Sequence, residues 1–309
     1  MNAINTSAIQ SAAASSAAPS AASGTTTSGS LYLQPLMPGF GAEVCGLDLS
    51  REPDDATVDA LIAALNEHSL LILKRQNISQ EQHVALSRRF GELMIHVLKQ
   101  FLTTSHPEIY VLSNVAENGK PIGNHKEGWN WHSDLSYMAE PSMGSLLHAI
   151  ETPPEGADTL FASMHSAYEA LDPAMQQRIR HLKAVHSYTG YYGKAFADRA
   201  PLSEEQKAKT PDVIQPVVRT HPVTGRLSLY VGQDIVKEIC GLPEAESTAL
   251  LAELNAHAVS GAFTYRHKWS DGDLVIWDNR CTMHCATPYD DNKYRRVMHR
   301  TTVRGDRPF

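Results

Sequence analysis

The stretch Trp131-His132-Ser133-Asp134 decides which fold this chain can adopt. Successive side chains of a β-strand point to opposite faces, so on a strand continuing through Leu135 and Tyr137 the side chains of His132 and Asp134 would project together. A third candidate ligand, His284, follows the distant stretch Trp277-Asp278-Asn279-Arg280. Two histidines and one carboxylate can hold Fe(II) on one face and leave the other face open for chemistry. Because one strand offers only adjacent positions, the sequence predicts a jelly roll, whose two facing antiparallel sheets bring distant strands together.

A second two-residue period occurs in Arg295-Arg296-Val297-Met298-His299-Arg300. If this segment is a strand, Arg296 and Arg300 face one side, whereas Arg295, Val297 and His299 face the other. Guanidinium groups that point into a cavity are costly unless anions meet them, and the planar fork of arginine binds a carboxylate or sulfonate through two bonds. The sequence therefore predicts a cavity with one metal ion and two anion-binding arginines.

These residues resemble the taurine dioxygenase family of Fe(II)- and 2-oxoglutarate-dependent oxygenases, which includes 2,4-dichlorophenoxyacetate dioxygenase. The resemblance extends over roughly residues 31–309. An isolated His-x-Asp pattern is common by chance, but an ordered set of blocks is specific. Besides the two stretches above, the blocks are Arg89-Phe90-Gly91-Glu92-Leu93, Gly156-Ala157-Asp158-Thr159 and His221-Pro222-Val223-Thr224-Gly225.

The resemblance implies a mainly β fold with flanking helices, the double-stranded β-helix or jelly roll. It also implies an enzyme that uses Fe(II), 2-oxoglutarate and O2 to hydroxylate a small organic anion, with release of succinate and CO2. By this resemblance the catalytic iron ligands are His132, Asp134 and His284. Thr159 and Arg296 match the residues that hold the distal carboxylate of 2-oxoglutarate. Arg295 stays open as the alternative, because the loop after His284 is slightly longer here than in the family.

The same resemblance implies where the substrate binds. Arg300 matches an arginine that holds the anionic head of the substrate, His96 matches a substrate-contacting histidine, and Leu135 offers a backbone N–H to the same anion. Lys99 stands where the taurine enzyme has a tyrosine, and Gly128 stands where it has an asparagine. These two departures argue against taurine itself and leave a sulfonate, a sulfate ester or a carboxylate such as an aryloxyalkanoate. For Lys99 a solvated surface charge is an equal alternative to a substrate contact.

Other interpretations of the same residues have to be weighed. Taken alone, His132 and Asp134 could form a buried structural hydrogen bond. A desaturase is an alternative enzyme on this scaffold, whereas halogenases of this type usually lack the carboxylate ligand that Asp134 supplies. A protein that binds metal or ligand without catalysis is the alternative of another class. Both arginines and the complete ligand set count against it. Cys281 and Cys285 lack the further partners that a zinc knuckle needs.

Composition limits the remaining possibilities. The chain has 309 residues, a net charge of −7 and a pI of about 6.1, so it shows no basic footprint for nucleic acid. Four cysteines in so long a chain do not suggest a disulfide framework. No apolar run approaches the roughly 20 residues that span a membrane. We therefore expect a cytoplasmic enzyme, and the resemblance adds a homo-oligomer, either a dimer or a tetramer.

The chain divides into a tail and one domain. Residues 1–30 are rich in Ala, Ser and Thr and cannot bury enough surface to offset their ordering entropy, so we expect a disordered tail. Residues 31–309 are expected to form a single jelly-roll domain with helical insertions and a lid over residues 187–215. Helices are predicted over residues 54–68, 79–90, 164–171, 173–182 and 244–257, and strands over 31–49, 69–74, 108–113, 263–268 and 272–278. Residues 115–130 are predicted to form a mobile loop.

Overall fold

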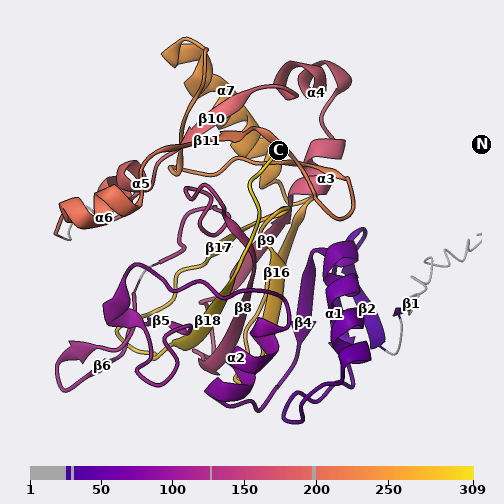
Figure 1. The fold of residues 1–309 in the computed structure, drawn as a ribbon, viewed down its shortest axis with the longest axis vertical. Coiled ribbons are helices and arrows are strands. Elements are labelled where there is room, and N and C mark those ends of the chain that lie inside the picture. Colours follow the sequence, from indigo (N-terminus) through magenta and orange to yellow (C-terminus); the bar gives the residue numbers. More distant parts are fainter. Residues whose placement is uncertain (1–25, 29–30, 126, 197–199) are drawn as a thin grey trace, which may run out of the picture.

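The computed structural model describes residues 26–28, 31–125, 127–196 and 200–309 (Figure 1). The tail expected over residues 1–30 lies outside this described part except for β1 (Thr26–Ser28), which pairs with β2 (Leu31–Met37). No helix among the described residues is both long and apolar enough to cross a membrane.

The largest sheet has eight strands and supplies one wall of the core. Its neighbours pair antiparallel, apart from the parallel pair of β3 (Phe40–Cys45) and β4 (Leu70–Leu73). The order is β1, β2, β3, β4, β16 (Leu274–Asp278), β8 (Ser142–Glu151), β18 (Val297–Arg304) and β5 (Tyr110–Ser113). The central strands β4 and β16 read as nearly continuous apolar runs because both of their faces are covered.

A second sheet packs on this one. It has three strands in the order β15 (Thr264–His267), β9 (Thr159–Ser163) and β17 (Thr282–Ala286). Phe161 of β9 is fully buried in one apolar cluster with Trp277 of β16 and Met298 of β18, so the two sheets share a core. Smaller sheets are β11 (Val213–Pro216) with β10 (Lys183–His186) and β14 (Val236–Ile239), β12 (Val218–Thr220) with β13 (Leu227–Leu229), and β6 (Ala116–Glu117) with β7 (Lys120–Pro121).

The helices lie outside the sheets, as expected (Figure 1). They are α1 (Asp55–His68), α2 (Gln80–Arg88), η1 (Lys99–Phe101), α3 (Met164–Glu169), α4 (Pro173–Ile179), α5 (Tyr188–Ala195), α6 (Glu204–Lys209) and α7 (Glu244–Ala258). The first two helices begin where the sequence predicted them, near residues 54 and 79. Asp54 accepts a hydrogen bond from the Thr57 N–H at 2.8 Å, and Ser79 forms a capping box with Gln82.

One element differs from the expectation at a decisive place. Residues 132–137 do not form a strand: His132 makes a single antiparallel bridge to His284, and the chain then turns at Asp134. Leu135 has a left-handed φ of 57°, and its carbonyl accepts a hydrogen bond from the Met138 N–H at 2.8 Å. This turn prevents further pairing along β17, so the shared direction of the two metal-ligand side chains comes from a bridge followed by a turn.

Candidate active site

His132 and His284 are held side by side by their own backbones. The His132 N–H donates to the His284 carbonyl at 3.1 Å, and the His284 N–H donates to the His132 carbonyl at 2.8 Å. The two imidazole rings lie 4.2 Å apart, centroid to centroid. His284 is also fixed from the other side, because β17 pairs with β9 and sets it opposite Phe161. The main chain therefore places both imidazoles.

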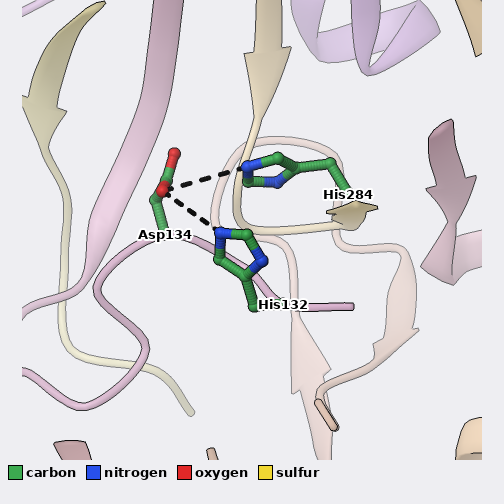
Figure 2. A group of neighbouring side chains, drawn as sticks. All are labelled: His132, Asp134 and His284. Carbon is green, nitrogen blue, oxygen red and sulfur yellow. Dashed lines mark ion pairs between the residues drawn. The ribbon is translucent and has the colours of Figure 1, made fainter. Parts of the chain in front are cut away.

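Asp134 completes the group that Figure 2 shows, in which the carboxylate and both imidazoles point toward one another. Oδ1 of Asp134 lies 3.7 Å from Nε2 of His132 and 3.9 Å from Nε2 of His284. One ligand atom from each residue lies within 4.8 Å of the others. Bonds from such ligands to a divalent ion are about 2 Å long, so one ion can bridge these atoms with small adjustments. The chemistry of this donor set fits Fe(II).

The side chains behind Asp134 orient its carboxylate. Ser145 of β8 donates from Oγ to Oδ2 at 2.7 Å, and Arg300 of β18 donates from Nη1 to Oδ1 at 2.8 Å. The amide oxygen of Asn279 accepts a hydrogen bond from the Asp134 N–H at 3.1 Å. Burial alone would raise the pKa of Asp134, but the charges of Arg300 and the imidazoles outweigh it and hold this pKa well below its usual range. Asp134 is therefore ionised and ready to bind a cation.

Both histidines are prepared as neutral ligands. Nδ1 of His132 lies 2.7 Å from the carbonyl oxygen of Asn130, which fixes the proton on Nδ1 and leaves Nε2 free to bind a metal. Asn130 is in turn held by Asp234, which accepts a hydrogen bond from its amide at 3.0 Å. Burial, helped by the neighbouring His132, lowers the pKa of His284 to about 3, so this imidazole is neutral near pH 7. A neutral imidazole is the form that a metal ion needs.

The two expected 2-oxoglutarate anchors belong to the two different sheets that share the core. Thr159 is buried at the start of β9, and its Oγ1 accepts a hydrogen bond from Nε1 of Trp269 at 2.9 Å. Arg296 directly precedes β18, and its buried Nε has no hydrogen-bond partner among the described residues. Burial lowers the pKa of Arg296 to about 10. Arg295 is exposed, and its Nε donates to both carboxylate oxygens of Glu151 at 3.0 Å. A half-buried guanidinium whose Nε lacks a partner among the described residues fits an anion that the chain itself does not supply.

A narrow cavity of about 30 Å³ lies beside the metal ligands. Three of the four expected substrate residues line it: His96, Leu135 and Arg300. Arg300 sits over the ring of Tyr110 at 5.2 Å, and His96 stacks on the same ring at 4.1 Å between centroids. The fourth, Lys99, is exposed on η1 and is not among the lining residues.

Sequence reasoning missed several residues of this site. The cavity is also lined by Glu127, Tyr137, Tyr188, Tyr191 and Ile235. Tyr188 and Tyr191 lie on α5, inside the segment expected to form a lid, and the cluster of tyrosines there was the available signal. Ser145, which holds Asp134, carries no signal in the sequence, because only the register of β8 brings it there.

Comparison with known proteins agrees with this geometry. Residues 33–302 match the family described as "Taurine catabolism dioxygenase TauD, TfdA family". The alpha-ketoglutarate-dependent 2,4-dichlorophenoxyacetate dioxygenase of Cupriavidus pinatubonensis is 35% identical over 285 residues, which cover 89% of this chain and 98% of that protein. An alpha-ketoglutarate-dependent sulfate ester dioxygenase of Pseudomonas putida is 31% identical over 284 residues, covering 90% and 91% of the two chains.

Solved structures show the same relationship. The crystal structure of AAD-2 in complex with Mn(II) and N-oxalylglycine superimposes with a TM-score of 0.76 at 33% identity, covering 90% of this chain and 98% of that one. A taurine dioxygenase from Burkholderia xenovorans gives a TM-score of 0.75 at 33% identity, covering 90% and 92%. With its paired imidazoles, its buried carboxylate and these relatives, the chain belongs to the TauD, TfdA family of dioxygenases, which use Fe(II), 2-oxoglutarate and O2.

Proposed function

We propose that this chain is a double-stranded β-helix dioxygenase that hydroxylates a small organic anion, a sulfonate, a sulfate ester or a carboxylate. The observation that carries the proposal is the convergence of His132, Asp134 and His284 beside the buried Arg300. Arg296, whose buried Nε has no hydrogen-bond partner among the described residues, directly precedes the strand of Arg300. The relatives are named for a chlorinated aryloxyacetate and for sulfate esters, which are anions of this class. Two sheets that share one core, with helices outside them, support the jelly-roll arrangement.

Each part of the site has a separate task in this proposal. His132, Asp134 and His284 hold the metal on one face, and Arg296 with Thr159 holds the far carboxylate of 2-oxoglutarate. When bound, Fe(II), 2-oxoglutarate and O2 would supply the oxidising chemistry: one oxygen atom of O2 would enter the substrate as the hydroxyl group and the other would enter succinate, with CO2 released from the cosubstrate. The chain positions the reactants and excludes water, and a substrate fixed by its anionic head gains from proximity.

Arg300 is the proposed anchor of the substrate anion. One of its donors meets Asp134, while its buried Nε has no hydrogen-bond partner among the described residues. The backbone N–H of Leu135 and the ring of His96 are proposed as further contacts, because both residues line the same cavity. The cavity of about 30 Å³ has room for roughly one water molecule, so an organic anion requires movement of a wall. We propose that α5, with Tyr188 and Tyr191, is that wall and acts as a lid.

Arg296, rather than Arg295, is the proposed cosubstrate anchor. Arg295 already has a carboxylate partner at the surface, whereas Arg296 is half-buried and its Nε has no hydrogen-bond partner among the described residues. A non-catalytic binding protein would have no use for this second cation in addition to a complete metal site. A desaturase would use the same anchors, and product analysis separates it from a hydroxylase.

We also infer a cytoplasmic homo-oligomer, a dimer or a tetramer. Cys45, Cys240, Cys281 and Cys285 are all free thiols in the described part of the chain, which suits a reducing compartment that keeps iron ferrous. Light scattering of the purified protein tests the oligomeric state directly.

A pair of variants tests the proposed function. Replacing Arg296 with Met removes a charge-assisted hydrogen bond worth about 1.5–3 kcal/mol, so the KM for 2-oxoglutarate should rise about 10- to 100-fold. Arg295→Met removes only an exposed ion pair and should leave this KM within about twofold. Succinate release with Fe(II) and candidate anions is the measurement, and product analysis identifies the hydroxylated compound.

The opposite result would identify Arg295 as the anchor. If wild-type protein neither binds 2-oxoglutarate nor releases succinate with any anion, the chain is a binding protein on this fold.

A further inference from the structure

We propose that Glu127 selects the substrate, and that the substrate carries a hydrogen-bond donor, an ammonium or a hydroxyl group, in addition to its anionic head. This inference rests on the proposed function and narrows it. The class of compound is an acid with an apolar or aromatic body and a donor, whereas an anion without a donor is disfavoured.

Glu127 is the carboxylate of the cavity that the metal centre does not use. It lines the cavity together with Arg300, His96 and the tyrosines of α5. Its Oε2 accepts a hydrogen bond from the Tyr110 hydroxyl at 2.6 Å and another from the side-chain amide of Asn124. Both of these hydrogen bonds end on the same oxygen, and no hydrogen bond between described residues reaches Oε1. Glu127 therefore keeps one acceptor atom for another donor.

Tyr110 ties Glu127 to the proposed anion anchor. Its hydroxyl donates to Glu127, and its ring lies under the Arg300 guanidinium at 5.2 Å. His96 stacks on the same ring, at 4.1 Å between centroids and with an interplanar angle of 28°. One aromatic side chain thus holds a carboxylate at its edge and a cation over its face. The cavity presents two opposite charges at fixed places.

The tyrosines make the rest of the cavity suited to a flat apolar body. Tyr137 and Tyr188 stack at 4.4 Å between centroids, and both rings line the cavity. Aromatic rings bind other rings and alkyl groups by area and by offset stacking. Their presence in the same cavity as two charged groups favours a substrate that has polar groups on an apolar frame.

The physical reason for selection is the cost of burying an unpaired acceptor. A substrate that closes over Glu127 removes water from Oε1. An apolar group at that point leaves the carboxylate oxygen without a hydrogen bond, whereas a hydroxyl or ammonium group replaces the lost water. A site built to bond a donor rejects the analogue that lacks it far more strongly than an apolar pocket rejects an extra methyl group.

The charges of the cavity also favour a substrate with a donor group. Asp134 serves the metal, so Arg300 and Glu127 remain as the cationic and acidic side chains of the cavity that can meet the substrate. A simple anion satisfies the cation and is repelled by the carboxylate. An anion with an ammonium group satisfies both, and one with a hydroxyl group satisfies the carboxylate by hydrogen bonding.

The test compares isosteric pairs of compounds by calorimetry. The protein is loaded with Mn(II) and N-oxalylglycine, so that binding is measured without turnover. One pair is 3-aminopropane-1-sulfonate and butane-1-sulfonate, and the other is 4-hydroxyphenoxyacetate and 4-methylphenoxyacetate. In each pair a donor replaces a methyl group of similar size. We expect wild-type protein to bind the donor-bearing member of at least one pair about tenfold or more tightly, a ratio equivalent to 1.4 kcal/mol.

Two variants and a control assign the effect to Glu127. In Glu127→Leu the ratio should fall to within about twofold. In Glu127→Gln, which keeps an acceptor but removes the charge, an ammonium preference should be lost and a hydroxyl preference partly kept. Glu117→Leu changes an exposed glutamate on β6 and should keep the wild-type ratio. Thermal unfolding shows whether each variant is folded. If Glu127→Leu does not fold, Glu127→Gln alone tests whether Glu127 causes the donor preference.

Two results would overturn the inference. One is equal binding of both members of both pairs by wild-type protein. The other is a donor preference that survives in both folded Glu127 variants, which would leave Glu127 only the task of holding Tyr110. Failure of the proposed function gives a different result, because wild-type protein would then bind neither N-oxalylglycine nor any anion.

Discussion

Removal of the Arg300 guanidinium should affect metal-free and metal-loaded protein very differently. Arg300 is buried, and its Nη1 donates to Oδ1 of Asp134 at 2.8 Å. The same oxygen faces both imidazoles, so a metal ion and Arg300 neutralise the same carboxylate. In Arg300→Met the metal-free protein keeps a buried Asp134 charge without its main partner. In the metal-loaded variant the ion supplies that partner.

The magnitude follows from this arrangement. Removing one partner of a buried ion pair costs about 3–5 kcal/mol, which is the expected loss for the metal-free variant. With Mn(II) bound, the loss should be about 1 kcal/mol, mainly the contact of the guanidinium with Tyr110. The remaining roughly 2–4 kcal/mol must then reappear as tighter metal binding by the variant, about 30- to 1,000-fold in Kd.

Urea unfolding with and without Mn(II) measures the two losses of stability, and a Mn(II) titration of wild type and variant measures the change in metal affinity. Arg304→Met, an exposed position on the same strand that pairs with Glu92, serves as the control and should change stability by less than about 1 kcal/mol. Equal destabilisation of Arg300→Met in both conditions, with unchanged Mn(II) affinity, would refute the shared role of the Asp134 oxygen.

Two further predictions concern the histidines. Gly128 has a φ of 76°, and an added Cβ would lie 3.3 Å from Cε1 of His132, whereas Gly119 has a φ of 75° with no atom within 4 Å. Both Gly→Ala variants should lose about 1–2 kcal/mol of stability. Only Gly128→Ala should also bind Mn(II) more weakly, and equal Mn(II) affinity of the two variants would contradict this prediction. Burial lowers the pKa of His83 from 6.5 to about 3, so the unfolded chain binds more protons between these values and stability falls as the pH drops below 6.5. Between pH 7 and pH 5 the protonation of His83 in the unfolded chain lowers the free energy of unfolding by about 2 kcal/mol. The His83→Gln variant should lack this contribution in urea unfolding, and an identical pH dependence of both proteins would contradict the prediction.

Local signals in the sequence were enough for much of the fold. The helical period of the apolar residues predicted that helices begin near residues 54 and 79, where Asp54 and Ser79 cap α1 and α2 in the structure. The two-residue period placed Arg300 on the face that meets Asp134 and turned His299 to the other face, where it lies near His148. Periodicity within one element is therefore readable without knowledge of its neighbours.

Convergence between elements was harder to predict. A spacing of two residues suggested a strand at His132 and Asp134, but a bridge followed by a turn produces the same shared direction. Glu127 and Ser145 reach the site through the loop path and the strand register, and neither is visible in a local pattern. Lys99 matched a pocket position by resemblance, yet the short helix η1 leaves it exposed. These outcomes depend on packing, which sequence spacing does not encode.

The reciprocal backbone pairing of His132 with His284 has a consequence for how such a site can diversify. Because amide groups common to every residue hold the two imidazoles together, replacing side chains in the loop before His132, apart from Gly128, leaves their separation intact. New specificities can therefore arise by substitution at the rim of the cavity while the capacity to bind iron is retained. Directed evolution restricted to residues 115–127 should accordingly yield many variants that still load metal.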